Sequence, residues 1–164
     1  MAPLLVLLIS FVITVFVIKA IRKDYDIAFA ARIAMSVMLE FTSIGHFIYS
    51  KGMAMMMPDF IPYKLQFVYF TGIVEILAAI GLQIRNLRVL TAWLLIVFFI
   101  LLLPANIHAA IKHIDYQKGN FEGSGTGYLW FRVPLQILFI VWTYLSSIKN
   151  GYYPKVSRPG ISDG

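Results

Sequence analysis

The chain has 164 residues, of which 60% are hydrophobic and only 13% charged, and its net charge is +6 at pH 7. A soluble domain carries about a quarter charged residues, so this composition excludes one and predicts an all-α, polytopic membrane protein. The chain contains no cysteine, which excludes disulfides, thiol relays and thiolate metal sites within it.

The first apolar run covers residues 3–21 and is followed, not preceded, by basic residues. A secretory signal peptide carries its positive charge before the apolar run and ends at a small-x-small cleavage site. No Lys or Arg precedes the run, and the residues around Lys19 are not a small-x-small site. We therefore expect residues 1–26 to form a retained N-terminal transmembrane helix and a basic loop.

The second span, residues 27–49, is less apolar and contains Arg32, Glu40 and His46. Polar residues recur along it at three- and four-residue steps, which places them in one stripe on a helix. Lipid cannot satisfy such a stripe, so we expect it to face the helix bundle. The members of the stripe are Ser36, Glu40, Ser43, His46 and Ser50.

A loop over residues 50–64 holds two prolines and four methionines. Pro58 and Pro62 disfavour a continuous helix, so we predict a segment that lies on the membrane surface or covers the bundle. A Cu(I) site is the alternative, because thioethers are soft ligands, but interfacial packing explains the same methionines.

The third span, residues 66–84, carries one acidic side chain, Glu75, near its middle. At 1.5 Å per residue Glu75 lies roughly 14 Å from either end, close to the membrane midplane. A carboxylate costs about 2.5–3.5 kcal/mol there, so Glu75 is a candidate functional residue. Gly72, Ala79 and Gln83 share its face, as small and polar residues do at helix contacts.

The fourth span, residues 89–111, ends in the sequence PANIHAA, in which Pro104 predicts a kink close to Asn106 and His108. The glycines of the following loop, residues 112–127, do not form a nucleotide motif. The fifth span, residues 128–148, carries Arg132 near its start, in a stripe with Gln136, Thr143 and Ser147.

Basic residues predict the orientation of the five spans. With the N-terminus outside, the inner side receives eight of them and the outer side four: Lys51, Lys64, Lys112 and Lys118. The predicted location is therefore the bacterial inner (plasma) membrane, with residues 149–164 as a cytoplasmic tail. Because these charges lie in short loops and meet lipid headgroups, we predict no nucleic-acid partner.

This threading brings polar side chains from four spans into the outer half of the bundle. We predict a pocket there that binds a polar head such as a quinone carbonyl or an anion, with the glutamates handling protons. Each residue also has a structural explanation, such as snorkelling for Arg132, backbone satisfaction for Asn106, or pairing of Glu75 with Arg132. We predict no metal site. The candidates are Glu40, His46, Glu75, Asn106, His108 and Arg132.

Residues 28–148 resemble the DoxX-like family of small bacterial membrane proteins. The similarity rests on Gly45-His46, the Pro58/Pro62 loop, the sequence GIVEILAAIGL around Glu75 and the Pro-Ala-Asn that ends at Asn106. It implies a four-helix membrane domain, residues 27–148, to which the first helix is an addition. It also marks Arg32 and Glu75, with Asn106 in a subgroup, as family-matching positions.

Members of that family are linked to thiosulfate:quinone oxidoreductase as a small subunit, to oxidative-stress complexes and to redox maturation. The resemblance therefore implies an accessory subunit of a quinone-linked membrane complex, with a membrane or peripheral redox partner. The missing cysteines depart from thiol-handling relatives. A non-catalytic assembly factor, contacting its partner through Gly72 and Ala79, and a small proton-coupled transporter using Glu40 and Glu75 are the alternatives. A homo-oligomer is compatible with each, and no motif indicates an autonomous enzyme.

Overall fold

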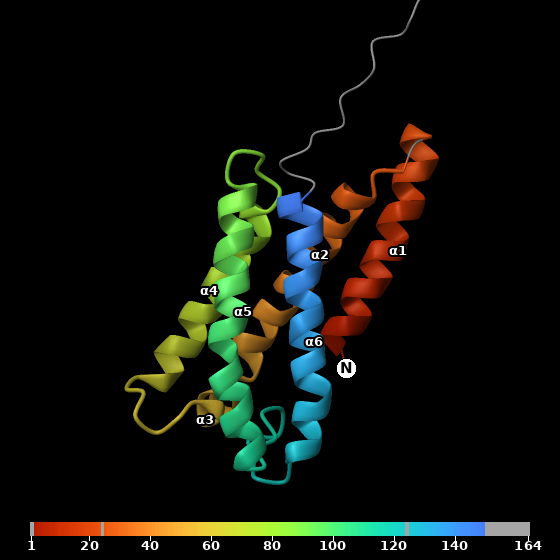
Figure 1. Cartoon of the computed structure of the whole chain (residues 1–164). Helices are drawn as coiled ribbons and strands as arrows, with labels where there is room; N and C mark the ends of the chain where they lie inside the picture. The colour runs from red at the N-terminus through yellow and green to blue at the C-terminus, as the bar shows by residue number, and fades with distance from the viewer. Residues whose placement is uncertain (1, 24, 124, 150–164) are drawn as a thin grey trace, which may run out of the picture.

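The computed structural model describes residues 2–23, 25–123 and 125–149, and these form a bundle of helices (Figure 1). A π-helical turn, η1, continues the last long helix, and one short helix lies at an end of the bundle. The elements are α1 (Ala2–Arg22), α2 (Ile27–Ile48), α3 (Ser50–Met56), α4 (Lys64–Gly81), α5 (Arg88–Ile111), α6 (Thr126–Thr143) and η1 (Tyr144–Lys149).

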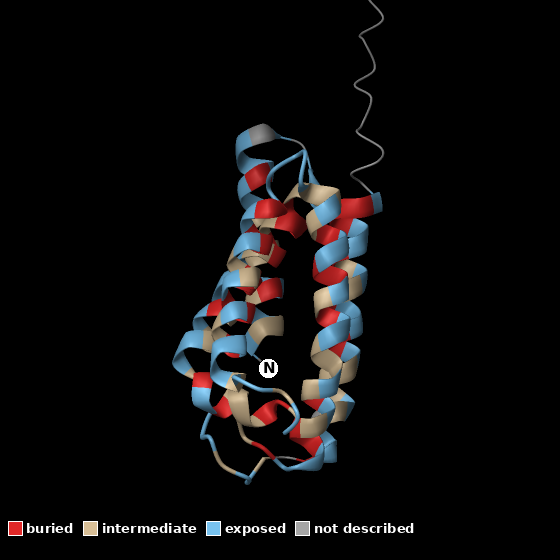
Figure 2. Ribbon diagram, turned by 90° about the vertical axis from the view of Figure 1, so that its left-hand side faces the viewer, coloured by how far each residue is buried: buried red, intermediate tan, exposed pale blue. Residues whose placement is uncertain are grey.

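Five helices are long and apolar enough to cross a membrane: α1, α2, α4, α5, and α6 together with η1. Their outward faces are exposed and apolar while their inward faces are buried (Figure 2). This outward apolar surface is the arrangement of a helical membrane protein. The predicted all-α class is thereby confirmed.

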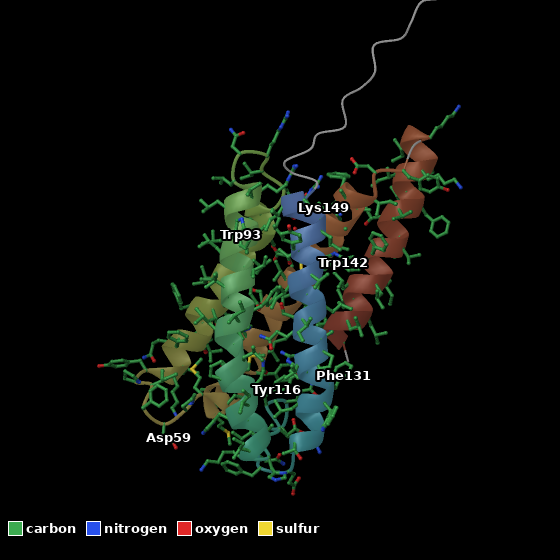
Figure 3. The ribbon with its side chains drawn as sticks, in the orientation of Figure 1. Asp59, Trp93, Tyr116, Phe131, Trp142 and Lys149 are labelled. Carbon is green, nitrogen blue, oxygen red and sulfur yellow. The ribbon has the colours of Figure 1, made fainter. Side chains whose placement is uncertain are left out.

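Two ends of the bundle differ in their chemistry. The basic end carries Lys19, Lys23, Arg85, Arg88 and Lys149, and the opposite end, called here the loop end, carries α3 and residues 112–123 (Figures 1 and 3). This division follows the predicted alternation of the spans. The other predicted inner charges, Lys155 and Arg158, lie outside the described residues.

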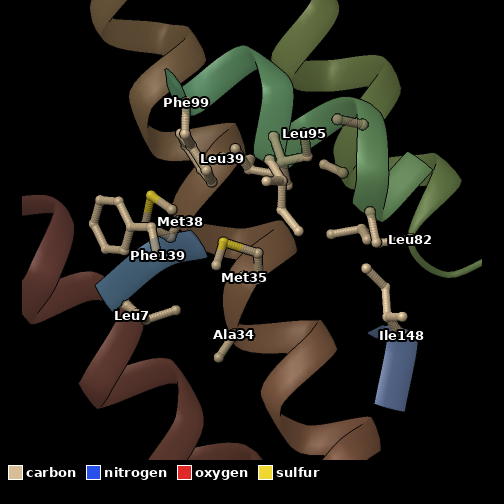
Figure 4. Close-up of a cluster of buried hydrophobic side chains, with 14 of the residues drawn as sticks. Leu7, Ala34, Met35, Met38, Leu39, Leu82, Leu95, Phe99, Phe139 and Ile148 are labelled. Carbon is tan, nitrogen blue, oxygen red and sulfur yellow. The ribbon is translucent and has the colours of Figure 1, made fainter. Parts of the chain in front are cut away.

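Close packing fills the half of the bundle nearer the basic end. Met35 and Leu39 of α2 meet Leu82, Leu95 and Ile148 in one apolar cluster (Figure 4). Lipid tails are as apolar as these side chains, so dispersion between well-fitted surfaces, rather than escape from water, stabilises the contact. Small residues let the helices approach closely: Ala34, Ala78, Ala79 and Ala92.

Hydrogen bonds from α2 to backbone carbonyls of α4 fix the register of this antiparallel pair. Ser36 Oγ donates to the Ala79 carbonyl at 2.7 Å, and Ser43 Oγ donates to the Gly72 carbonyl at 3.0 Å. The partners move seven residues along both helices in opposite directions. Gly72 makes the approach feasible, because a Cβ there would lie 3.0 Å from the Cβ of His46. The predicted polar stripe thus contacts α4.

At the loop end, α3 lies tightly against the segment that follows α5. A Cβ added at Gly52 would lie 1.9 Å from the Tyr116 carbonyl oxygen, so no larger residue fits without a backbone shift. The rings of Tyr49 and Tyr116 make an edge-to-face contact at 6.1 Å, and the imidazole Nδ1 of His108 lies 3.0 Å from the Met56 carbonyl. The predicted covering segment therefore contains one short helix.

Candidate functional site

A cavity of about 420 Å³ lies in the half of the bundle nearer the loop end. Side chains from α2, α4, α5 and α6 line it. The first turn of α1, the short helix α3 and Tyr116 also contribute to the lining, and Figure 3 labels Tyr116. Most of the wall is apolar, and α2, α4, α5 and α6 each contribute polar groups to it. Volume and lining match small-molecule sites, which span roughly 300–1,000 Å³.

Four of the six predicted site residues line this one cavity. They come from four different helices: His46 from α2, Glu75 from α4, Asn106 from α5 and Arg132 from α6. The sequence places each on the inward face of its helix, since the outward positions beside them are apolar and exposed. The cavity is therefore a junction of helices rather than a feature of one.

Glu75 is the most buried ionisable group in the cavity, with 4% of the residue exposed. Its carboxylate oxygen Oε1 lies 3.6 Å from Nε2 of His46, while Oε2 has no hydrogen-bond partner among the described residues. Buried polar atoms in proteins are almost always hydrogen-bonded. An unpartnered carboxylate oxygen that faces a cavity therefore marks a position where a ligand can bind.

The surroundings of His46 determine where its proton lies. Nδ1 is 3.2 Å from the Val68 carbonyl and 3.0 Å from the Thr71 hydroxyl, and that hydroxyl itself donates to the Val68 carbonyl at 2.8 Å. Because a carbonyl only accepts, the tautomer with the proton on Nδ1 satisfies the contact with Val68. Nε2 then faces Oε1 of Glu75 across the 3.6 Å contact. Both residues of the pair line the cavity.

On the other wall, an amide network joins α5 to α6. Asn106 Nδ2 donates to Gln136 Oε1 at 3.3 Å, and Gln136 Nε2 donates to the Phe99 carbonyl. All three residues are buried and line the cavity. The chain of donors orients the amides, so that the polar wall has a fixed arrangement when a ligand arrives.

The structure places Glu40 outside the cavity, which corrects the sequence-based prediction. Glu40 is exposed on α2 and does not line the site. At 100° per residue it lies about 140° around α2 from Met35 and about 160° from Met38, which are fully buried on the bundle side. The three- and four-residue spacing predicted that Glu40 belongs to the polar stripe. The side chain lies at the edge of that stripe and is exposed rather than buried against the bundle.

His108 also lies outside the cavity, despite being two residues from Asn106. Two residues along a helix turn the side chain by about 200°, so one of the pair faces the cavity and the other faces away. His108 instead lines a separate hollow with Asp59, Lys64 and Lys112, where its contact with the Met56 carbonyl tethers α3 to α5. Its place in the predicted pocket is corrected.

Thr71 and Gln136 belong to the site but were not among the predicted candidates. Each lies one helical turn from a candidate, Thr71 before Glu75 and Gln136 after Arg132. That four-residue spacing was the available signal. Within the ranges described, no three His, Asp or Glu side chains are grouped closely enough to hold a metal ion.

The fold and the cavity together define a multi-pass helical membrane protein with a polar interior site. Residues 35–147 match a family described as a domain of unknown function (DUF8561), and the chain belongs to that family. The match begins within α2, so it includes the four predicted site residues that line the cavity and omits α1. No curated protein and no solved structure matches the chain, and the likeness to DoxX-like proteins stays a prediction.

Proposed function

We propose that the protein is an accessory subunit of a quinone-linked redox complex and that its cavity binds a quinone head. The observation that carries this proposal is the buried, unpartnered Oε2 of Glu75 beside His46. Quinone chemistry exchanges protons at two ring oxygens, and an acid–base pair at the ring matches that need. The electrons would pass to or from a redox partner protein, because this chain offers no thiol.

The rest of the wall supports the same ligand class. Amide and guanidinium groups at Asn106, Gln136 and Arg132 suit hydrogen bonding to a carbonyl oxygen on the side opposite Glu75. Thioether sulfurs contact aromatic rings favourably and adapt to their shape. Four methionines line the cavity: Met38, Met53, Met56 and Met57.

Binding of a decyl-tailed benzoquinone to the purified protein in quinone-free nanodiscs tests this function. Glu75→Gln should weaken binding about 10–100-fold, which corresponds to a charge-assisted hydrogen bond of about 1.5–3 kcal/mol. Glu40→Gln is the matched control, because it makes the same change at an exposed glutamate and should leave affinity within twofold. Equal affinity for wild type and Glu75→Gln would contradict the proposal.

A membrane assembly factor is the second candidate function, and Glu40 is the observation that favours it. This carboxylate is exposed in the interior of a membrane span, where lipid solvates it poorly. A partner helix with a polar or basic group would remove that cost. The contact face predicted from Gly72 and Ala79 is not available for this role, because α2 covers both residues.

Pull-down from membranes separates the two functions. If the protein is chiefly an assembly factor, Glu40→Leu should release a dominant membrane partner while Glu75→Gln retains it. The opposite pattern, or a protein that retains no partner, would count against this candidate. A homo-oligomer would appear in the same experiment as capture of a differently tagged copy.

The proposed location is the bacterial inner membrane, with the loop end outside. Positive charge at the basic end favours a cytoplasmic position for that end. The cavity then lies in the outer leaflet half of the protein. Protease protection of a tag placed after residue 164 in spheroplasts would check the orientation.

A further inference from the structure

We infer that the ligand of the cavity is an amphiphile whose hydrocarbon tail leaves the protein sideways into the bilayer, between α2 and the first turn of α1. This inference rests on the proposed function and specifies how its ligand enters and lies. It comes from the residues that face both the cavity and the exterior.

Only a few of the cavity-lining residues are also exposed. One of them, Gln117, lies at the loop end, and the others are apolar and belong to α1 and α2. Residues that line the cavity from α4, α5 and α6 are buried or half-buried. The cavity therefore meets the lipid-facing surface along one flank. The exposed apolar lining residues are Ala2, Phe41, Ile44 and Ile48.

The position of α1 explains this flank. Its first turn lies part way along α2, while α2 continues towards the loop end (Figure 1). Beyond that turn α1 packs closely, since Leu7 is fully buried and Phe11 makes an edge-to-face contact with Trp142 at 5.1 Å (Figure 3). The boundary between α1 and α2 is thus closed towards the basic end, and the cavity opens to the lipid-facing surface beside Phe41 and Ile44.

The aqueous route is more obstructed. At the loop end α3 lies against the Tyr116 backbone at Gly52, and the Tyr49–Tyr116 ring contact lies on the cavity wall. Charged groups are also absent from the flank lining, where Thr42 and Gly45 are the neighbours of Phe41 and Ile44. An apolar flank beside a polar interior fits a molecule with a polar head and a hydrocarbon tail.

Photolabelling in nanodiscs tests the flank. A benzoquinone with a diazirine at the end of a ten-carbon tail should label residues 41–48 and the first turn of α1. Ile44→Trp should reduce that labelling at least fivefold, because the indole fills the opening. Ile73→Trp is the matched control, since Ile73 is 48% exposed on α4 and Ile44 is 57% exposed on α2, and it should reduce labelling less than twofold.

Two further arms distinguish the failure of this inference from failure of the proposed function. A tail-less benzoquinone should bind Ile44→Trp within twofold of wild type, and an equal loss for both ligands would overturn the lateral route. Labelling of residues 112–123 or of α3 would also overturn it. A diazirine-tailed phospholipid whose labelling of residues 41–48 falls at least fivefold in Ile44→Trp, while the quinone probe labels nothing, would retain the lateral route and reject the quinone.

Discussion

The two halves of the bundle each bury one charged side chain, but they hold it differently. Arg32, in the packed half, is 6% exposed and donates from Nη1 to the Ser146 carbonyl at 2.9 Å, with its guanidinium over the Phe29 ring. Glu75, in the hollow half, has one contact at 3.6 Å and one oxygen without a partner in the described structure. The first charge joins helices, and the second faces a space.

This difference separates a structural charge from a functional one. Arg32 also leaves Nε without a partner among the described atoms, yet it lines neither the large cavity nor the hollow beside His108. Its guanidinium satisfies a backbone carbonyl at the π-helical turn, where the helical hydrogen-bond register changes. In this protein, Glu75 is the buried charge that adjoins a cavity, and it is therefore the candidate for a ligand site.

Arg32→Ala should give the largest loss of stability. The change leaves the Ser146 carbonyl unsatisfied and removes buried packing, so we expect a loss of about 2–4 kcal/mol in the free energy of unfolding. Thermal unfolding in detergent measures it, and Arg85→Ala, at an exposed position, should cost less than about 0.5 kcal/mol. Equal effects would remove the structural role assigned to Arg32.

Gly52→Ala should give the second effect, confined to the loop end. The added Cβ collides with the Tyr116 backbone, and overpacking of this kind costs about 1–3 kcal/mol. Limited proteolysis within residues 112–123 should accelerate. Gly127→Ala is the control, because a Cβ there has no neighbour within 4 Å, and it should leave proteolysis unchanged. Unchanged cleavage in Gly52→Ala would show that α3 does not close this end.

Glu75→Gln should change stability less, and in the opposite direction. A neutral amide is easier to bury than a carboxyl group with an unpartnered oxygen, and its NH₂ can donate to Nε2 of His46. The ligand-free variant should melt at or slightly above the wild-type temperature. A destabilisation comparable to that of Arg32→Ala would erase the contrast between the two buried charges.

The smallest effect concerns Asp59, outside the membrane spans. Lys64 donates to its carboxylate at 2.8 Å and lowers the pKa of Asp59, mainly through that hydrogen bond. Since the folded-state pKa lies below the unfolded one, the pair stabilises the fold above the unfolded pKa and this contribution disappears as the pH falls through the folded pKa. The Asp59 side chain is 86% exposed, so salt should screen the effect.

An NMR titration of labelled Asp59 carboxyl carbon measures that shift. The pKa of Asp59 should return to its ordinary value in Lys64→Ala. The melting temperature of Asp59→Asn should differ from that of wild type only at pH values above the pKa of Asp59. A pKa unchanged by Lys64→Ala would contradict the pairing.

Hydropathy, loop charge and proline positions predict the five spans well, because a bilayer imposes length and composition on each segment separately. Helical spacing also placed His46, Glu75, Asn106 and Arg132 on inward faces. It failed for Glu40 and His108, which lie near inward residues in sequence but face other directions. The role of α1 at the cavity flank depends on how far α1 is shifted along α2, and no local sequence pattern determines that shift.

The most direct test of the central claim is an experimental density map of the protein purified with a benzoquinone. The account predicts ligand density in the cavity, with a polar atom within hydrogen-bonding distance of Glu75 Oε2 and the opposite side of the head near Asn106 and Gln136. Glu75 facing acyl chains, or close-packed hydrocarbon between Glu75 and Asn106, would contradict it.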